Sequence, residues 1–164
     1  MPHPSVEGRG QVTHGLGRRR AVFITALLCL TPLPVLASET CRVSFSTGAV
    51  VEAAVARTVA EQAKGLSGKT GKLLFVWTDA EPRVFWMKDT PAPLDVAFID
   101  DLGTVFDIQA MSVDAPGSAL PVYYFSGAPA RYALELPAGE FARTGIAIGD
   151  KLDALACTSQ DSAD

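Results

Sequence analysis

Histidine is scarce in this sequence, and its positions exclude several kinds of chemistry. The 164-residue chain holds two histidines, His3 and His14, and both precede residue 38. The remainder of the chain therefore has no imidazole for general-base work, for a zinc site or for a Ser-His-Asp triad. A glycine-rich phosphate loop and a dinucleotide-binding fingerprint are lacking as well. We accordingly expect no cofactor and no metal.

Residues 1–37 have the features of a secretory signal rather than of a folded domain. Three consecutive arginines, at positions 18–20, precede an apolar run over residues 21–30, which has signal-peptide length and is short for a membrane span. A small-x-small pattern then ends at Ala37, where we predict cleavage. The export route, general secretion or twin-arginine, is left open. We expect the mature protein to be periplasmic or secreted and not to span the membrane.

Basic residues are few in the rest of the chain. Setting aside the four arginines and one glutamate of residues 1–37 leaves 10 basic and 17 acidic residues, a net charge of about −7. Nucleic-acid binding is driven largely by lysine and arginine replacing counterions, so a nucleic-acid partner is not expected. With 48% hydrophobic and 20% charged residues the chain belongs to the class that folds. Its length fits a single domain over residues 38–164.

Cysteine is also rare, with two residues left after the predicted cleavage. Cys41 and Cys157 lie near opposite ends of the mature chain. An oxidising compartment and an even count favour a disulfide that joins an N-terminal strand to a C-terminal one. The alternative is a pair of free thiols whose spacing is accidental. If the disulfide forms, no thiol nucleophile remains in the domain.

Short β-rich runs separated by turns dominate the sequence after residue 38. Alternation of apolar and polar residues within the runs, and turn residues between them, favour hairpins and an antiparallel sheet. The segment Asp100–Gly103, for example, lies between two such runs. The expected strands are residues 42–46, 50–55, 73–77, 84–90, 94–101, 104–110, 131–136 and a last one that ends at Cys157.

Two short helices and one long loop interrupt these strands. The first helix is expected to begin at Thr58, with Glu61 at the capping-box offset, and to end at Gly65. The second is expected over residues 137–144. Residues 111–126 lack periodicity and predict a long surface loop. The predicted fold class is therefore mainly β (α+β), a small antiparallel barrel-like or open β domain with two short helices.

Five motifs carry a family resemblance. They are Lys64-Gly65-Leu66, LLFVW at residues 73–77, FWMKDTPAPLDVAFID at residues 85–100, LELPAG at residues 134–139 and GIAIGD at residues 145–150. In these motifs the chain resembles the domain of unknown function 192 family, DUF192. The resemblance implies a short, frequently exported and largely β protein whose biochemical role is not established. Ser67-Gly68-Lys69 stand where Met-Phe-Arg is common in the family, Leu73 where methionine is usual and Asp89 where asparagine is common. No role of that arginine can be carried over.

Polar and aromatic residues within and near the longest motif are the candidate ligand-binding residues. They are Trp86, Lys88, Asp89, Thr90, Asp95 and Glu135. Strand alternation places Asp95 and Glu135 opposite the apolar faces of their strands, so both carboxylates are expected to point outward. In a structural interpretation the two carboxylates cap turns or pair with Lys88 or Arg131. In a functional interpretation the two carboxylates and Lys88 line a pocket whose walls are Trp86 and a tyrosine of the YYF cluster. Such a pocket suits a sugar or another amphipathic ligand.

Three functions remain open on the sequence. The first, which we favour, is a non-catalytic domain of the cell envelope that binds a small ligand or a partner. The second is an envelope enzyme in which Asp95 and Glu135 form an acid/base pair aided by Lys88. The third is a structural accessory that binds an envelope protein through residues 111–126. The oligomeric state is left open.

Overall fold

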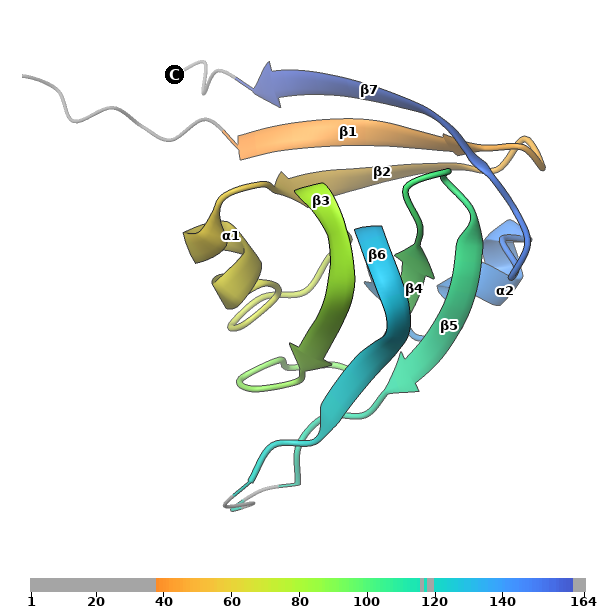
Figure 1. Cartoon of the computed structure of the whole chain (residues 1–164). Coiled ribbons are helices and arrows are strands. Elements are labelled where there is room, and N and C mark those ends of the chain that lie inside the picture. Colours follow the sequence, from red (N-terminus) through yellow and green to blue (C-terminus); the bar gives the residue numbers. More distant parts are fainter. Residues whose placement is uncertain (1–37, 116, 118–119, 161–164) are drawn as a thin grey trace, which may run out of the picture. The chain divides into compact units, whose positions relative to one another are not determined.

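The computed structural model of the protein describes residues 38–115, 117 and 120–160 (Figure 1). The predicted signal, residues 1–37, lies outside the described residues. Within them the chain forms a seven-stranded sheet and two short helices. In chain order the elements are β1 (Ser38–Phe45), β2 (Val50–Ala56), α1 (Val59–Lys64), β3 (Leu73–Trp86), β4 (Leu94–Ile99), β5 (Val105–Met111), β6 (Tyr123–Pro137), α2 (Glu140–Thr144) and β7 (Leu152–Gln160).

The sheet has the strand order β5-β4-β6-β3-β2-β1-β7 and stays open. Every neighbouring pair is antiparallel except β2 and β3, which run parallel. The two edge strands approach each other at a bridge between Thr104 and Lys151, but the sheet does not close there. The prediction of a mainly β domain with two short helices is confirmed, in its open form. The hairpin predicted at Asp100–Gly103 joins β4 to β5.

The first and last strands are joined by the predicted disulfide. Strand β1 pairs with β2 on one side and with β7 on the other, and Cys41 lies directly opposite Cys157 in the β1–β7 register. The two Cα atoms are 4.0 Å apart, and the sulfurs are bonded. Beside the disulfide, the Arg57 guanidinium donates a hydrogen bond of 2.8 Å to the Glu39 carboxylate. This hydrogen bond holds the pKa of Glu39 below its ordinary value.

Helix α1 provides the crossover that a parallel pairing of β2 with β3 requires. Its capping box forms as predicted: Thr58 Oγ1 accepts a hydrogen bond from the Glu61 amide, and the Glu61 carboxylate accepts one from the Thr58 amide at 2.9 Å. The Thr58 and Arg57 amides hold the pKa of Glu61 below its ordinary value. Gly65 ends the helix. In the described residues no helix has the length and apolar character needed to cross a membrane.

Apolar side chains cover both faces of the sheet and form two clusters. Strand β4 shows this directly, because Ala97 and Ile99 pack in the first cluster whereas Val96 and Phe98 pack in the second. All four side chains are fully buried. The neighbouring strand β6 is covered in the same way over residues 133–136. A side chain of this part of β6 that points away from one cluster therefore meets the other cluster instead of water.

Two segments differ from their predicted bounds because strand β6 is longer than expected. The predicted loop over residues 111–126 ends at residue 122, since Tyr123, Tyr124 and Phe125 pair with the end of β3. Pro137 still belongs to β6, so α2 begins at Glu140. The last strand likewise continues beyond Cys157 to residue 160, where it pairs with the start of β1.

Strand β3 is also longer than either of the two runs predicted for it. It continues from Leu73 to Trp86 through Pro82, with register shifts near the proline where the ladder to β6 is irregular. Residues 81–86 of β3 and 123–130 of β6 pair with each other, and we call this paired segment the β3–β6 arm. The two long strands run side by side in Figure 1.

Candidate functional site

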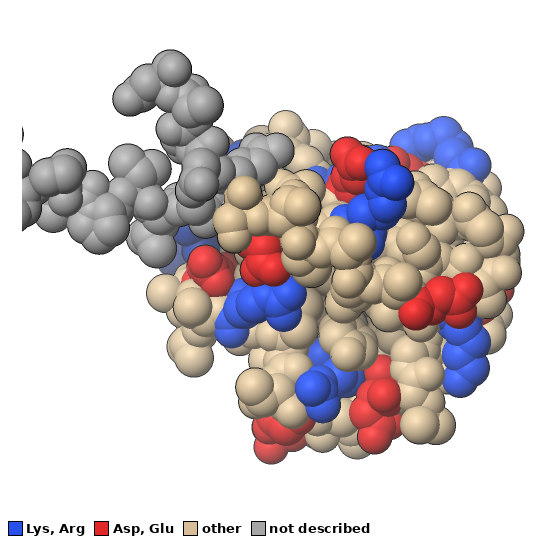
Figure 2. All heavy atoms as spheres, turned by 90° about the horizontal axis from the view of Figure 1, so that it is seen from above, with Lys and Arg blue, Asp and Glu red and all other residues tan. Residues whose placement is uncertain are grey.

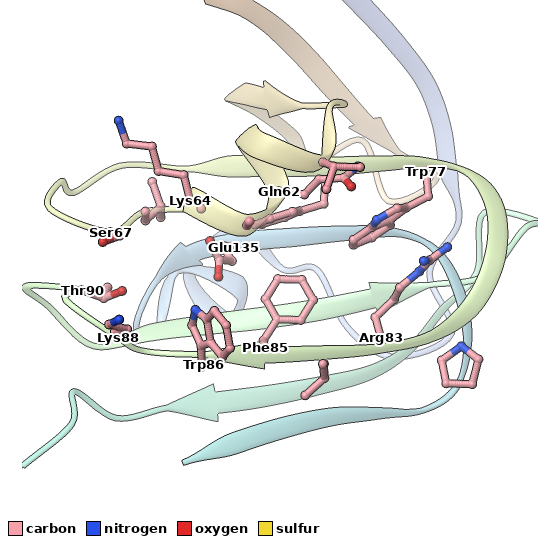
Figure 3. A pocket seen from close by; sticks show the side chains of 17 residues that line it. Gln62, Lys64, Ser67, Trp77, Arg83, Phe85, Trp86, Lys88, Thr90 and Glu135 are labelled. Carbon is pink, nitrogen blue, oxygen red and sulfur yellow. The ribbon is translucent and has the colours of Figure 1, made fainter. Parts of the chain in front are cut away.

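A pocket of about 380 Å³ lies between α1 and the β3–β6 arm. This volume is within the range of small-molecule sites in proteins. The side chains that line it come from α1 and the turn after it, from both halves of β3 and the turn that follows it, and from β6, and Figure 3 shows them from close by. Four of them are aromatic and four are charged: Phe75, Trp77, Phe85, Trp86, Lys64, Arg83, Lys88 and Glu135.

Three of the aromatic side chains, Phe75, Trp77 and Phe85, form a connected wall. Phe85 meets Phe75 edge to face with ring centroids 4.8 Å apart, and Phe75 stacks on Trp77 at 5.7 Å. The guanidinium of Arg83 lies over the Trp77 ring, 4.4 Å from its centroid. Phe85 is buried in the second cluster, as core packing predicts, while Trp86 is 46% exposed. The Trp86 ring lies apart from this wall, 6.0 Å from the Tyr123 ring, and remains open to a ligand.

Glu135 is the polar group at the centre of the pocket (Figure 3). Its side chain is buried, at 4% exposure, and its Oε2 atom has no hydrogen-bond partner in the described part of the chain. Burial raises the pKa of Glu135 to about 8. At neutral pH the carboxyl is therefore mostly protonated and can donate a hydrogen bond as well as accept one.

The prediction that Glu135 points outward is wrong. Glu135 pairs with Leu73 of β3 on one side and with Val96 of β4 on the other, so it lies in the interior of the sheet and faces the second apolar cluster. Alternation correctly separated Glu135 from its apolar neighbours on β6. Alternation nevertheless predicted the wrong environment, because the face of β6 that carries Glu135 is covered by the second apolar cluster. The apolar run from Val96 to Ile99 in β4 is the sequence signal for a strand buried on both faces.

Four of the six candidate residues meet at this pocket and two do not. Trp86, Lys88, Thr90 and Glu135 line it. Asp95 is half-buried elsewhere, and its Oδ2 atom accepts a hydrogen bond of 2.7 Å from the Gly139 amide before α2. Asp95 therefore caps a turn, as the structural interpretation predicted. The residue opposite it on β6 is Leu136, not Glu135, so the acid/base pair considered from the sequence is not brought together.

Asp89 forms the turn that follows the β3–β6 arm. Its φ angle is +56°, in the left-handed region that aspartate and asparagine tolerate better than most residues. The Thr90 amide donates to the Met87 carbonyl across the turn, and the Gly68 amide donates to the Asp89 carbonyl. Asp89 thus shapes the backbone that carries Lys88 and Thr90 and does not itself line the pocket.

Asp89→Ala should lower the free energy of unfolding by about 1 kcal/mol, because alanine is strained in the left-handed region. Asp89→Asn and Asp89→Gly should leave the stability within a few tenths of a kcal/mol of the parent. Urea unfolding of the three variants measures this difference, with Lys88→Ala as a control at the neighbouring position. Equal losses in all three Asp89 variants would show that the side-chain carboxylate, rather than the backbone angle, is what matters.

Several lining residues were not singled out from the sequence. The sequence places Trp77 in a strand and in the LLFVW motif, and Lys64 in the first helix and in a family motif, but neither pattern indicates a binding role. Gln62 belongs to the predicted helix, and its amide nitrogen donates to the Val76 carbonyl at 3.0 Å, tying α1 to β3. Arg83 lies between the two strands predicted over residues 73–77 and 84–90. These residues meet because α1 lies across from the arm, a contact between segments about 20 residues apart that no local pattern signals.

One group of thiol and carboxylate side chains is close enough to hold a metal. Ligand atoms of Glu39, Cys41 and Cys157 lie within 4.8 Å of one another. The two sulfurs are joined in the disulfide, and Glu39 is paired with Arg57. Neither thiolate is available as a ligand, so this group is better explained as a structural cross-link.

Comparison with known proteins gives the family of the chain. The profile of DUF192, a family described as "Uncharacterized ACR", matches residues 42–154. The chain belongs to the DUF192 family. The matched range contains every residue that lines the pocket, so the pocket lies wholly within the DUF192 domain. No curated protein matches this chain.

Two crystal structures are similar to this DUF192 protein. One, from Sinorhizobium meliloti 1021, is described as that of a "putative transcription regulator"; it is 29% identical, the match covers 73% of this chain and 95% of that one, and the TM-score is 0.59. The other is a protein of unknown function from Novosphingobium aromaticivorans DSM 12444, 31% identical over 76% of this chain and 90% of that one, with a TM-score of 0.61. The family and these relatives leave the biochemical role of the DUF192 domain open.

Proposed function

We propose that this DUF192 domain binds a small amphipathic molecule, without catalysis, in the pocket between α1 and the β3–β6 arm. The observation that carries the proposal is the buried carboxyl of Glu135, which lies in an aromatic-walled pocket with one oxygen lacking a partner. Leaving a buried polar group unsatisfied costs about 1–3 kcal/mol. A ligand that hydrogen-bonds to Glu135 and covers the aromatic wall would offset that cost and remove apolar surface from water.

Binding is favoured over acid/base catalysis by the placement of the acidic residues. Asp95, the second carboxylate of the enzyme hypothesis, is engaged by the Gly139 amide and does not line the pocket. Glu135 is thus the single carboxylate among the charged lining residues, whose other members are Lys64, Arg83 and Lys88. Acid/base catalysis on a carboxylate pair would need two such groups at one site.

We further propose that the protein works outside the cytoplasm, in the periplasm or as a secreted protein. The signal features of residues 1–37 and the Cys41–Cys157 disulfide support this location. The description of the Sinorhizobium meliloti relative raises the question of nucleic-acid binding, but a net charge of about −7 over residues 38–164 argues against it here. On the face seen in Figure 2, basic and acidic side chains are interspersed.

A thermal-shift screen of the oxidised protein tests the proposed function. The compounds would be cell-wall sugars, nucleotides, lipid fragments and aromatic acids, amines and alcohols. A ligand present at a hundred times its dissociation constant adds about 2.7 kcal/mol of stability, enough to raise the melting temperature by several degrees. We expect at least one class of amphipathic compounds to give such a shift.

Two variants of α1 make the screen specific for the pocket. Ala63 lines the pocket from α1, whereas Ala60 lies on the same helix, is also exposed and does not line it. Ala63→Phe should fill part of the pocket and abolish the shift, while Ala60→Phe should leave it intact. A stabilising compound that acts equally on both variants binds elsewhere and would count against the proposal.

A further inference from the structure

Two lysines at one end of the pocket have no partner in the part of the chain that the structure describes. Lys64 and Lys88 both line the pocket and are exposed, and Figure 3 shows them at the same end as Ser67 and Thr90. Among the described residues neither ammonium group forms an ion pair or a hydrogen bond. The third lining cation differs, because Arg83 is paired with Asp79 at 3.2 Å at the other end of the pocket.

The charge of the pocket is opposite in sign to that of the domain around it. Residues 38–164 hold 17 acidic residues against 10 basic ones, yet Glu135 is the single acidic residue in the lining, beside three cations. The two unpaired lysines therefore leave an excess of positive charge at one end of an otherwise aromatic cavity. Such an excess attracts an anion and disfavours a cation.

We propose that the ligand is an amphipathic anion whose ring or chain packs on the aromatic wall, whose carboxylate is attracted by the ammonium groups of Lys64 and Lys88, and which also accepts a hydrogen bond from Glu135. This inference rests on the proposed binding function and names the chemical class of the ligand. The carboxylate remains near solvent, where two lysines can pair with it without full desolvation.

A cationic ligand is disfavoured by the state of Glu135. Burial raises the pKa of this carboxyl to about 8, so at neutral pH it is mostly uncharged. It therefore offsets little of the cost of removing an ammonium group from water. A polyhydroxylated ligand is less well matched, because four of the lining side chains are aromatic and the Gln62 amide nitrogen is already bound to the Val76 and Arg57 carbonyls. The aromatic wall then accounts for the apolar part of the ligand.

A matched series of three probes tests the sign of the ligand charge. The probes are 4-phenylbutyrate, 4-phenylbutanol and 4-phenylbutylammonium, which share a phenyl ring and a four-carbon chain. Both tryptophans of the chain, Trp77 and Trp86, line the pocket, so their fluorescence reports binding there directly. At neutral pH and low salt we expect the carboxylate to bind about tenfold more tightly than the ammonium, with the alcohol between them.

Lysine variants separate this inference from the proposed function. In the double variant Lys64→Gln and Lys88→Gln, the affinity for 4-phenylbutyrate should fall to within about twofold of that for 4-phenylbutanol. The affinity for 4-phenylbutanol should not change. Lys69→Gln is the control, because Lys69 is an exposed lysine that does not line the pocket. Equal binding of all three probes, or tightest binding of the ammonium, would overturn the anion inference and leave the binding function standing. Failure of all three probes to bind would count against the binding function itself.

Discussion

Raising the pH from about 5 to about 9 should lower the free energy of unfolding by about 3–5 kcal/mol more in the parent protein than in Glu135→Gln. In the folded protein burial raises the pKa of Glu135 to about 8, while its ordinary value is 4.5. The shift is caused by desolvation of the charged form. Glutamine has a similar size and no charge to desolvate.

The direction of the effect follows from which state holds the proton. Below pH 4.5 both states are protonated, and Glu135 contributes nothing to the pH dependence. Between pH 4.5 and about 8 the unfolded chain has lost its proton and the folded one keeps it, so a rising pH favours unfolding. Above about pH 8 both states are ionised and the loss is complete. The charged groups that share the pocket lining with Glu135 are Lys64 from α1 and Arg83 and Lys88 from the β3 side, while its register partner on β4 is the apolar Val96.

Urea unfolding at about pH 5 and about pH 9 measures this effect. The parent, Glu135→Gln and Glu52→Gln would be compared, with Glu52 as an exposed glutamate on β2. Glu52→Gln should retain the pH dependence of the parent. An equally steep fall in Glu135→Gln would mean that Glu135 is ionised in the folded protein at neutral pH, and the account of the pocket given above would then be wrong.

Removing the Cys41–Cys157 disulfide should lower the free energy of unfolding by about 4–5 kcal/mol. The bond joins residues 116 positions apart, and a closed loop of this length restricts the unfolded chain strongly. It also ties edge strand β7 to β1. We expect Cys41→Ala with Cys157→Ala to show the full loss in urea unfolding.

Reduction of the parent protein provides the control for this prediction. The reduced parent should be destabilised by a similar amount, and the double variant should not respond to the reductant. A loss below about 1 kcal/mol in the double variant would contradict the prediction. It would indicate that β1 and β7 are held by their ladder and by the first apolar cluster without the cross-link.

Local signals in the sequence predicted much of the fold. The Thr58–Glu61 capping box, the turn at Asp100–Gly103 and the pairing of Cys41 with Cys157 each depend on short motifs or on a count, and each is present. The parallel pairing of β2 with β3 was not predicted, because antiparallel hairpins are the simplest reading of closely spaced strands. The continuous strand through Pro82 was missed because proline usually marks a break.

The sequence predicted only some of the residues that line the candidate site, and the difference has a physical cause. Trp86, Lys88 and Thr90 were found because one motif carries them to the same end of the arm. The predicted environment of Glu135 was wrong because alternation shows on which face of the strand a side chain lies, but not whether other side chains cover that face. The lining residues of α1 were missed because they meet the arm through tertiary packing.

The most direct test of ligand binding in this pocket is a nitrogen-15 NMR titration that follows the two indole N–H signals. These signals belong to Trp77 and Trp86, and both side chains line the pocket. Adding a compound that stabilises the protein in the screen should shift at least one indole signal in a saturable way, and Ala63→Phe should abolish the shift. If every stabilising compound leaves both indole signals unmoved, or if no compound stabilises the protein, the pocket is not the binding site proposed here.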